Sequence, residues 1–450
     1  MTSLPSPATA LTRRLSRWDL VVYGLLFIGP LAPVGVYGVL DARTAGAVAL
    51  VYIVATVAMG FTAWSYAVMS REVPHAGSVF AYASRGLGST AGFFAGWLAM
   101  LDYLLIPSVA YLFSGIALHA IVPAVPAWVF TVAAFTGTTL LNLAGVRVAA
   151  RAGFVVLVVE LIVLVLFLGI AAWILATTGP ARPWLSPLLG VTPIDTAMVL
   201  GAVSVAVLSY LGFDAIASFA EENAGDARHV GQAIGVCLAV AGVAFVAQTW
   251  AVALLSPDAP AALLAEPNRQ GTAFYAIARV GIGGWMAMLL AVTKAVGPAF
   301  AAMTGQAAAA RLLFGMARDG RLPQALAHVD PASGVPRAAL LTTAAATLAI
   351  SVWAARRSDG LSVLVSIVDV GALGAFVLLH ASVVGYFVVR KFAAARAAHV
   401  AMPLAGIAVI GWVLAEASVV AQTVAGVWLA AGVVAWLLGR RSARAAGPTA

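Results

Sequence analysis

The stretch Phe27-Ile28-Gly29-Pro30-Leu31-Ala32-Pro33-Val34-Gly35 interrupts the apolar run of residues 18–40. Its two prolines have no backbone N–H to donate, and its two glycines tolerate dihedral angles that other residues avoid. We therefore expect no continuous α-helix across this stretch. In a bilayer such a break is tolerated only where it faces protein or a watery cavity, so the run is interpreted as an interrupted membrane span.

A second interruption follows five spans later, at Ser209-Tyr210-Leu211-Gly212-Phe213-Asp214 within the run 197–219. The first break starts 11 residues into its run, and the second starts 12 residues into its run. Either feature alone is also compatible with a simple kink or a packing glycine. Interruptions at corresponding positions of two halves are the best sequence indication of a secondary transporter's binding site, so the pair predicts a transporter.

The composition also indicates a membrane protein. Of the 450 residues 63% are hydrophobic and 9% are charged, whereas soluble domains carry about 25% charged residues. The alternating pattern of an outer-membrane barrel is absent, so we predict an all-α membrane protein with 12 transmembrane helices. The basic residues behind the net charge of +8 are spread between the apolar runs, which argues against nucleic-acid binding. The single cysteine excludes an internal disulfide and argues against a metal cluster, and we expect no cofactor.

We divide the chain into a cytoplasmic tail (1–17), a transporter core (18–390), two peripheral spans (391–438) and a second cytoplasmic tail (439–450). The first apolar run is too long for the core of a signal peptide, so we expect it to remain as the first span. The predicted spans are 18–40, 45–69, 89–118, 126–146, 153–177, 197–219, 231–255, 285–310, 337–354, 361–388, 401–417 and 420–438.

The distribution of arginine and lysine predicts the orientation in the membrane. With the N-terminus inside, basic residues are about three times more frequent in the inner segments than in the outer ones. An even number of spans then places both termini in the cytoplasm, and we predict the cell (inner) membrane as the location. The connections 70–88, 256–284 and 311–336 are long enough for short surface helices, but none would hold a soluble domain.

Three motifs resemble those of the amino acid–polyamine–organocation transporters. They are similar to the family's span-6 signature, its loop after span 2 and its loop after span 8. Here they are Tyr210–Ala215 followed by Glu221, Glu222 and Arg228; Glu72–Ser78 with Tyr82; and Met316–Gly320 with Leu322 and Pro323. The resemblance covers residues 18–390. It implies a LeuT-like five-plus-five inverted repeat with broken helices 1 and 6 and with spans 11 and 12 peripheral.

Within this family, the segments Phe27–Pro33 and Leu101–Leu105 look most like the putrescine importer branch. A broken helix exposes half-helix ends, whose N-termini attract anions and whose bare carbonyls attract cations. We therefore expect both breaks, with the acids and aromatic residues beside them, to line the substrate site. The predicted substrate-binding residues are Ile28, Gly29, Pro30, Leu31, Ala32, Asp102, Tyr103, Tyr210, Leu211, Gly212, Phe213, Asp214 and Asp369.

The charged residues within the spans indicate the kind of substrate. Four acids, Asp102, Glu160, Asp214 and Asp369, stand against one base, Lys294. A charge at the centre of a membrane helix costs about 2.5–3.5 kcal/mol or more, so each is a functional candidate. The excess of acids favours a cationic substrate, a proton, or both. Asp102 is expected to bind the amine or a proton, or else to pack against a hydroxyl; Asp214 either contacts the amine or holds the unwound segment; Asp369 would meet the far amine of a diamine.

Glu160 lies where proton-coupled relatives carry a lysine in the middle of span 5. Lys294 lies about 14 Å from the outer end of span 8, and Glu160 lies roughly 10 Å from the inner end of span 5. In a hydrocarbon core of about 30 Å their depths meet within several ångströms. Our hypothesis is a Glu160–Lys294 pair that a proton breaks during transport, with Asp102 as a further proton-coupling candidate.

Charged residues also gather at the inner end of span 6. Glu221 and Glu222 end the span, and Arg228 follows shortly after them. This spacing predicts an inner-gate ion pair, with an ordinary solvated turn as the alternative.

Together these features predict a secondary active transporter that imports a small amine, a polyamine such as putrescine, by proton-coupled alternating access. The alternative is an amino acid permease, either a proton symporter or an exchanger, although Pro30 and Pro33 remove two donors that a carboxylate would use. Sodium coupling stays open because Thr304 offers a hydroxyl in span 8, and a non-transporting receptor is a weaker alternative. No nucleophile or metal constellation points to an enzyme. The expected partners are the small substrate, a proton and the lipid bilayer, with the chain as a monomer or homodimer.

Overall fold

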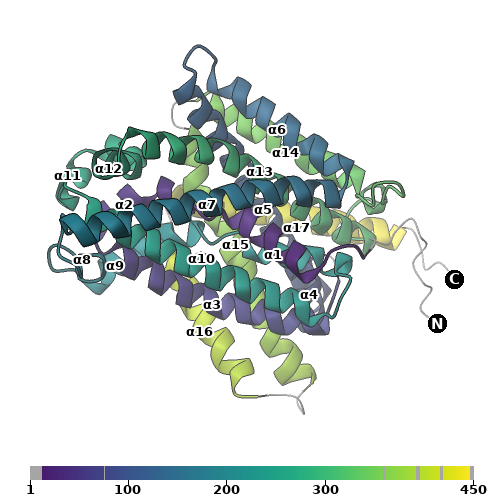
Figure 1. The fold of residues 1–450 in the computed structure, drawn as a ribbon. Helices are drawn as coiled ribbons and strands as arrows, with labels where there is room; N and C mark the ends of the chain where they lie inside the picture. Colours follow the sequence, from purple (N-terminus) through teal and green to yellow (C-terminus); the bar gives the residue numbers. More distant parts are fainter. Residues whose placement is uncertain (1–12, 76, 358–359, 392–395, 416–418, 446–450) are drawn as a thin grey trace.

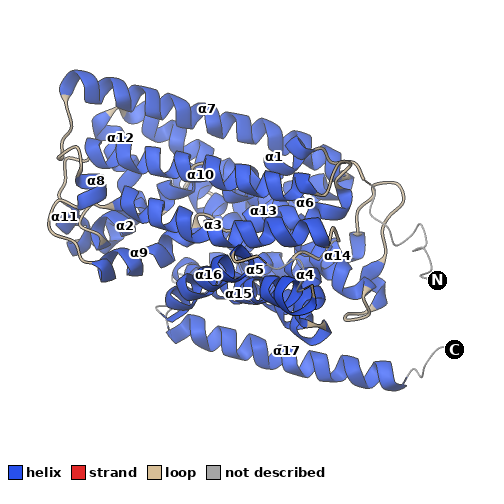
Figure 2. Cartoon of the chain, turned by 90° about the horizontal axis from the view of Figure 1, so that it is seen from below, coloured by secondary structure: helices blue, strands red, loops and turns tan. Residues whose placement is uncertain are grey.

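The computed structural model describes residues 13–75, 77–357, 360–391, 396–415 and 419–445 (Figure 1). Within these residues every regular element is helical (Figure 2), and the one strand-like contact is a bridge between Leu15 and Asn223. Twelve helices of the described part are long and apolar enough to cross a membrane. This confirms the predicted all-α, 12-span membrane protein.

The membrane helices follow the predicted spans, with the first and sixth spans divided. They are α1 (Arg17–Ile28), η2 (Ala32–Gly35) and α2 (Tyr37–Arg43) in span 1, α3 (Val48–Glu72), α5 (Ser89–Ile121), α6 (Ala127–Ala144), α7 (Val146–Thr178), α9 (Thr196–Leu208) and η3 (Phe213–Glu222) in span 6, α10 (Arg228–Leu255), α13 (Gly284–Arg318), α14 (Arg337–Ala355), α15 (Gly360–Val383) with η6 (Val384–Arg390), α16 (Ala398–Ala415) and α17 (Val419–Ala445).

Both predicted breaks are present. In span 1 the α-helix ends at Ile28, Gly29 adopts a φ of +75°, and a 3₁₀ turn precedes α2. In span 6 the α-helix ends at Leu208, Gly212 adopts a φ of +117°, and η3 continues as a 3₁₀ helix of 10 residues. Such long 3₁₀ stretches are uncommon and often mark a functional hinge.

The two breaks touch each other, which explains why the second one needs a glycine. A Cβ placed on Gly212 would lie 2.8 Å from Phe27 Cγ, so a larger residue would push into the ring that ends α1. The positive φ of Gly212 is also a conformation that residues with a Cβ rarely adopt. The unwound segments of spans 1 and 6 therefore form one continuous region in the middle of the bundle.

The packing follows the predicted inverted repeat. The most extensive helix contacts are those of α5 with α13 and of α3 with α10, which join spans 3 and 8 and spans 2 and 7. These are corresponding helices of the two five-span halves. Figure 2 shows α17 along one edge of the bundle and α7 along the opposite edge. Trp97 of α5 and Trp428 of α17 fix that edge, because their rings stack at 4.7 Å and each indole donates a 2.7 Å hydrogen bond to the other residue's carbonyl.

The long connections carry short helices, as expected. Several helices extend further than the apolar runs predict; α7 begins at Val146, α13 continues to Arg318 and α17 continues to Ala445. Hydropathy identifies only the part of a helix that crosses the hydrocarbon, whereas the backbone continues past it. The short elements are α4 (Val79–Leu87), α8 (Ser186–Leu189), α11 (Pro260–Ala265), η4 (Pro267–Thr272), α12 (Ala273–Gly281) and η5 (Gln324–Ala327).

Candidate substrate site

Asp214 stands directly after the break of span 6 and is 2% exposed. Its Oδ2 accepts a 2.7 Å hydrogen bond from the Tyr103 hydroxyl of α5, and its Oδ1 accepts one of 3.3 Å from the backbone N–H of Gly212. Both carboxylate oxygens thus hold the unwound segment in place. Of the two expected roles, this geometry favours the holding role in the conformation described.

Aromatic rings surround this carboxylate. Tyr66 of α3 meets Phe213 at 6.2 Å and Phe376 of α15 at 5.8 Å, each edge to face. The Tyr66 hydroxyl lies within electrostatic range of both Asp214 and Asp102. Tyr66 and Phe376 were not among the predicted site residues, because helices that are apolar on all sides do not show which face points inward.

Asp102 lies where α5 crosses α15, and it is 1% exposed. A Cβ on Gly371 of α15 would lie 2.9 Å from the Asp102 backbone nitrogen and 2.8 Å from the Leu98 carbonyl oxygen. The two helices therefore approach closely at the depth of this acid. Asp369 belongs to the same part of α15, but its side chain lies outside what the structure describes.

The break in span 1 is held by a residue that the sequence reasoning missed. Gln248 of α10 donates a 2.9 Å hydrogen bond from Nε2 to the Pro30 carbonyl oxygen. Ile28 and Leu31 beside it are 6% and 1% exposed, whereas Gly29 and Ala32 are partly exposed and a Cβ on Gly29 would meet no atom within 4 Å. The sequence could have indicated this residue, because Gln248 places an amide deep in the largely apolar run 231–255.

Tyr210 points away from Asp214 and toward α3. Its hydroxyl lies 2.6 Å from Thr56 Oγ1, and the neighbouring Ser209 lies 2.9 Å from the Tyr52 hydroxyl. These contacts attach the end of α9 to the second span. Tyr210 and Phe213 thus lie on different sides of the break, the first against α3 and the second against Tyr66 and α15.

Glu160 reaches the helix that carries Lys294. Glu160 is 2% exposed, and its carboxylate reaches α13 at Gly297, where an added Cβ would collide with Oε1. Gly297 lies one helical turn after Lys294, which is half-buried and interacts electrostatically with Glu160. The sequence argument from depth therefore brings together the right two helices, and Gly297 is the space that admits the carboxylate.

At the C-terminal end of span 6 the two glutamates pair with arginines of α13 rather than with Arg228. Glu222 bonds the Arg311 guanidinium, and both side chains are at most 3% exposed. Glu221 forms a two-pronged ion pair with Arg318, one bond of which measures 2.8 Å. Arg228 is exposed at the start of α10, and its backbone N–H donates to Asp226. The predicted partner is therefore corrected: the glutamates pair with α13, while the Arg228 backbone is held by Asp226 in the turn before α10.

The residues before α1 close the same end. The backbone N–H groups of Arg14 and Leu15 donate to the Glu222 carbonyl oxygen at 2.8 and 2.9 Å. The Tyr23 and Phe219 rings stack at 4.7 Å, and the cavity beside them holds about 10 Å³, no more than one water. Among the residues that the structure describes, this cavity is too small to admit a substrate.

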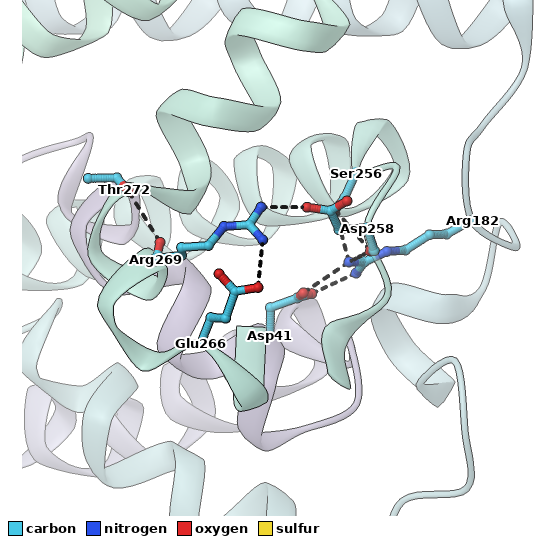
Figure 3. Close-up of polar contacts among 7 residues, drawn as sticks. All are labelled: Asp41, Arg182, Ser256, Asp258, Glu266, Arg269 and Thr272. Carbon is cyan, nitrogen blue, oxygen red and sulfur yellow. Dashed lines mark hydrogen bonds and ion pairs between the residues drawn. The ribbon is translucent and has the colours of Figure 1, made fainter. Parts of the chain in front are cut away.

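A second polar network holds α2, the second half of span 1 (Figure 3). Arg182, in the connection after α7, bonds both Asp41 oxygens at 2.7 and 3.0 Å and the Ser256 hydroxyl at 2.9 Å. Asp258 continues the network to Arg269 at 2.9 Å. Asp41 of α2 is thereby fixed to two outer connections, which no sequence motif indicates.

The acids and aromatic residues of the candidate site are buried in this conformation, while Gly29 and Ala32 of the span-1 break are partly exposed. Asp102, Tyr103, Tyr210, Phe213 and Asp214 are each at most 2% exposed.

Comparison with known proteins agrees with this architecture. A family model described as "Amino acid permease" matches residues 20–437. The chain belongs to this permease family. It is a membrane transporter by family and not an enzyme, as predicted, and the expected membership of the amino acid–polyamine–organocation superfamily is confirmed.

Individual relatives of the permease carry different substrates. The low-affinity putrescine importer PlaP of Escherichia coli (strain K12) is 28% identical over 94% of this chain and 93% of its own length. The branched-chain amino acid permease BcaP of Bacillus subtilis (strain 168) is 26% identical over 85% of this chain and 82% of its own. The methylthioribose transporter of the same organism is 27% identical over 86% of this chain and 84% of its own.

Proposed function

We propose that this permease imports a small diamine such as putrescine by proton-coupled alternating access. The observation that carries the proposal is the pair of buried acids, Asp102 and Asp214, which both lie within electrostatic range of the Tyr66 hydroxyl. A diamine has an ammonium group at each end and an apolar middle. Two carboxylates and the aromatic faces of Tyr66, Phe213 and Phe376 match that chemistry.

The charge balance around the breaks supports a cationic substrate. Lys294 interacts with Glu160, and Arg311 is bonded to Glu222, so these basic side chains of α13 are directed to other acids. Neither of these basic residues is bonded to Asp214, whose carboxylate oxygens accept from the neutral donors Tyr103 and Gly212. A similarity to the putrescine importer PlaP over almost the whole chain points the same way.

We assign proton coupling to the Glu160–Lys294 pair, with Asp102 as the second candidate. A proton on Glu160 would weaken its attraction to Lys294 and loosen α7 from α13. The Thr304 hydroxyl donates to the Phe300 carbonyl oxygen of its own helix at 3.3 Å, which gives sodium coupling less support. We further propose that the transporter lies in the inner membrane with both termini in the cytoplasm, because the basic residues favour that orientation.

Uptake by the purified full chain in liposomes tests this function. Radiolabelled putrescine is supplied with and without an inward proton gradient, and unlabelled amines and amino acids compete. Sodium is replaced by potassium in a parallel series. We expect uptake that the gradient stimulates and that polyamines block. If putrescine is inert while an amino acid is carried, the acids serve structure or coupling and the diamine proposal fails.

The second candidate is amino acid transport, by proton symport or by exchange. Two observations favour it: both Asp214 oxygens are already occupied by Tyr103 and Gly212, and the family includes a branched-chain amino acid permease. Exchange would appear as uptake stimulated by unlabelled substrate inside the liposomes. A receptor that does not transport would bind a ligand without any uptake. Light scattering of the purified protein separates the monomer from the homodimer.

A further inference from the structure

Gln248 has an orientation that its neighbours determine. Its Nε2 lies 2.9 Å from the Pro30 carbonyl oxygen and 3.0 Å from the Ala244 carbonyl oxygen. Both neighbours are acceptors, so the atom between them must be the nitrogen of the amide. The position of the amide oxygen, Oε1, follows from this.

Oε1 of Gln248 is buried and has no hydrogen-bond partner among the described residues. The whole side chain is 0% exposed. Donors are scarce beside it, because Pro30 and Pro33 have no backbone N–H. A buried acceptor without a donor bears its full cost of desolvation, so a donor from outside the chain would stabilise this arrangement.

The amide lies between the two breaks. On one side it bonds Pro30 of span 1, as described. One helical turn away in α10, Phe245 packs edge to face on Tyr52 at 5.5 Å and on Tyr210 of span 6 at 5.0 Å. Gln248 is therefore a residue of a third helix placed where the unwound segments meet.

We propose that Gln248 Oε1 accepts a hydrogen bond from an ammonium group of the substrate. This inference rests on the proposed amine transport and adds a neutral acceptor on α10 to the acids Asp102 and Asp214. An ammonium group carries three donors, which one carboxylate does not satisfy by itself. The same oxygen repels a carboxylate, so Gln248 selects amines against amino acids at this end of the site.

Two substitutions distinguish a role of Gln248 in binding the substrate from a role in supporting the break of span 1 alone. Gln248→Met and Gln248→Glu both lose the donor to Pro30, but only Gln248→Glu keeps an acceptor. Binding of radiolabelled putrescine to the purified full chain gives the affinity. Competition by 4-aminobutyrate, which has a carboxylate in place of one ammonium, gives the selectivity. Thr249→Val is the matched control, because the Thr249 hydroxyl bonds only carbonyls of its own helix.

We expect Gln248→Met to weaken putrescine binding about 10-fold and to reduce the preference over 4-aminobutyrate. Gln248→Glu is expected to bind putrescine within about threefold of the parent protein and to sharpen that preference. Equal losses in both variants, or no loss in Gln248→Met, would overturn the proposal and leave Gln248 as a support for the break.

If Gln248→Met does not fold, Gln248→Asn tests whether the amide oxygen binds the substrate. Asparagine keeps the amide group, but its side chain is one methylene shorter, so the oxygen is withdrawn from the substrate. We then expect weaker putrescine binding in a folded protein, and unchanged binding would overturn the inference. A parent protein that binds an amino acid but no amine disproves the proposed function as well. Binding of putrescine by the parent, without the predicted difference between variants, disproves only the role of Gln248.

Discussion

The Tyr103 hydroxyl donates a 2.7 Å hydrogen bond to Asp214 Oδ2 and so ties the unbroken helix α5 to the break of span 6. Both residues are buried, and the second oxygen of Asp214 accepts the Gly212 N–H. The carboxylate therefore determines where the 3₁₀ segment η3 begins. Any rearrangement of this segment during transport has to keep or replace these two bonds.

Tyr103→Phe is expected to destabilise the protein by about 1–3 kcal/mol, because it leaves a buried carboxylate oxygen without its donor. Putrescine uptake should fall at least about 10-fold, since the break loses its attachment to α5. Thermal unfolding in detergent and uptake in liposomes measure the two effects. Tyr111→Phe is the control on the same helix, because Tyr111 bonds Thr138, away from the breaks. Equal effects of both substitutions would contradict a special role for Tyr103.

Asp102→Asn removes a buried charge at the crossing of α5 and α15. If this acid binds one end of the diamine, KM for putrescine should rise about 10-fold or more. A 10-fold rise corresponds to a loss of about 1.4 kcal/mol in binding free energy. Asp195→Asn is the matched control, since Asp195 caps α9 through a bond to the Met198 N–H that asparagine can also accept. An unchanged KM in Asp102→Asn, with altered dependence on the proton gradient, would assign Asp102 to coupling instead.

The two breaks could be predicted from the sequence because their causes are local. Proline lacks a donor wherever it stands, and Gly212 has a positive φ that its own lack of a Cβ permits. The number of spans follows from the length and polarity of each run, which are also local properties. These features need no knowledge of what packs against them.

The partners of the charged residues could not be predicted in the same way. Glu222 is followed within six residues by Arg228, yet it pairs with Arg311 from a helix much later in the chain. The sequence of a helix that is apolar on every side does not show which face points inward. Tyr66 and Gln248 therefore could not be predicted as site residues either. The approach of Glu160 to the helix of Lys294 could be predicted, because counting residues from the end of each span gives the depth of a side chain in the membrane.

A double substitution tests whether Glu160 and Lys294 act as a pair. Glu160→Gln and Lys294→Met each leave one uncompensated charge in the membrane, which is costly. The double variant removes both charges, so it should transport better than the worse single variant. Uptake measured for all four proteins under the same gradient decides the question. A double variant no better than either single one would show that the two residues act independently.

Gly297→Ala tests the space through which Glu160 reaches α13. A Cβ at this position collides with Glu160 Oε1, so the carboxylate would be displaced from the neighbourhood of Lys294. We expect stimulation by the proton gradient to be lost, while binding of putrescine stays within about threefold. Gly169→Ala in α7 is the control, because an added Cβ there meets no atom within 4 Å. Full gradient stimulation in Gly297→Ala would contradict this contact as the coupling element.

The inner ion pairs differ in burial, and this difference predicts different outcomes. Arg311 is 3% exposed, so Glu222→Gln leaves a buried charge without its partner and should cost about 3–5 kcal/mol. Arg318 is 22% exposed, so Glu221→Gln should change the free energy of unfolding by no more than about 1 kcal/mol. Thermal unfolding in detergent compares the two. Arg228→Gln, at the exposed start of α10, should match the parent protein.

Exchanging the charges of Glu222 and Arg311 tests whether stability depends on the ion pair between them or on each residue individually. In Glu222→Arg with Arg311→Glu the attraction is kept while its direction is reversed, so the double variant should regain part of the stability that either single reversal loses. Putrescine uptake by the double variant should recover less than its stability does. The reason is that Arg311 lies over the Phe219 ring at 4.2 Å, and this cation–π contact is lost when position 311 of α13 carries a glutamate. If Arg228→Gln instead proves as damaging as Glu222→Gln, the closure of the inner end depends on α10 and not on α13.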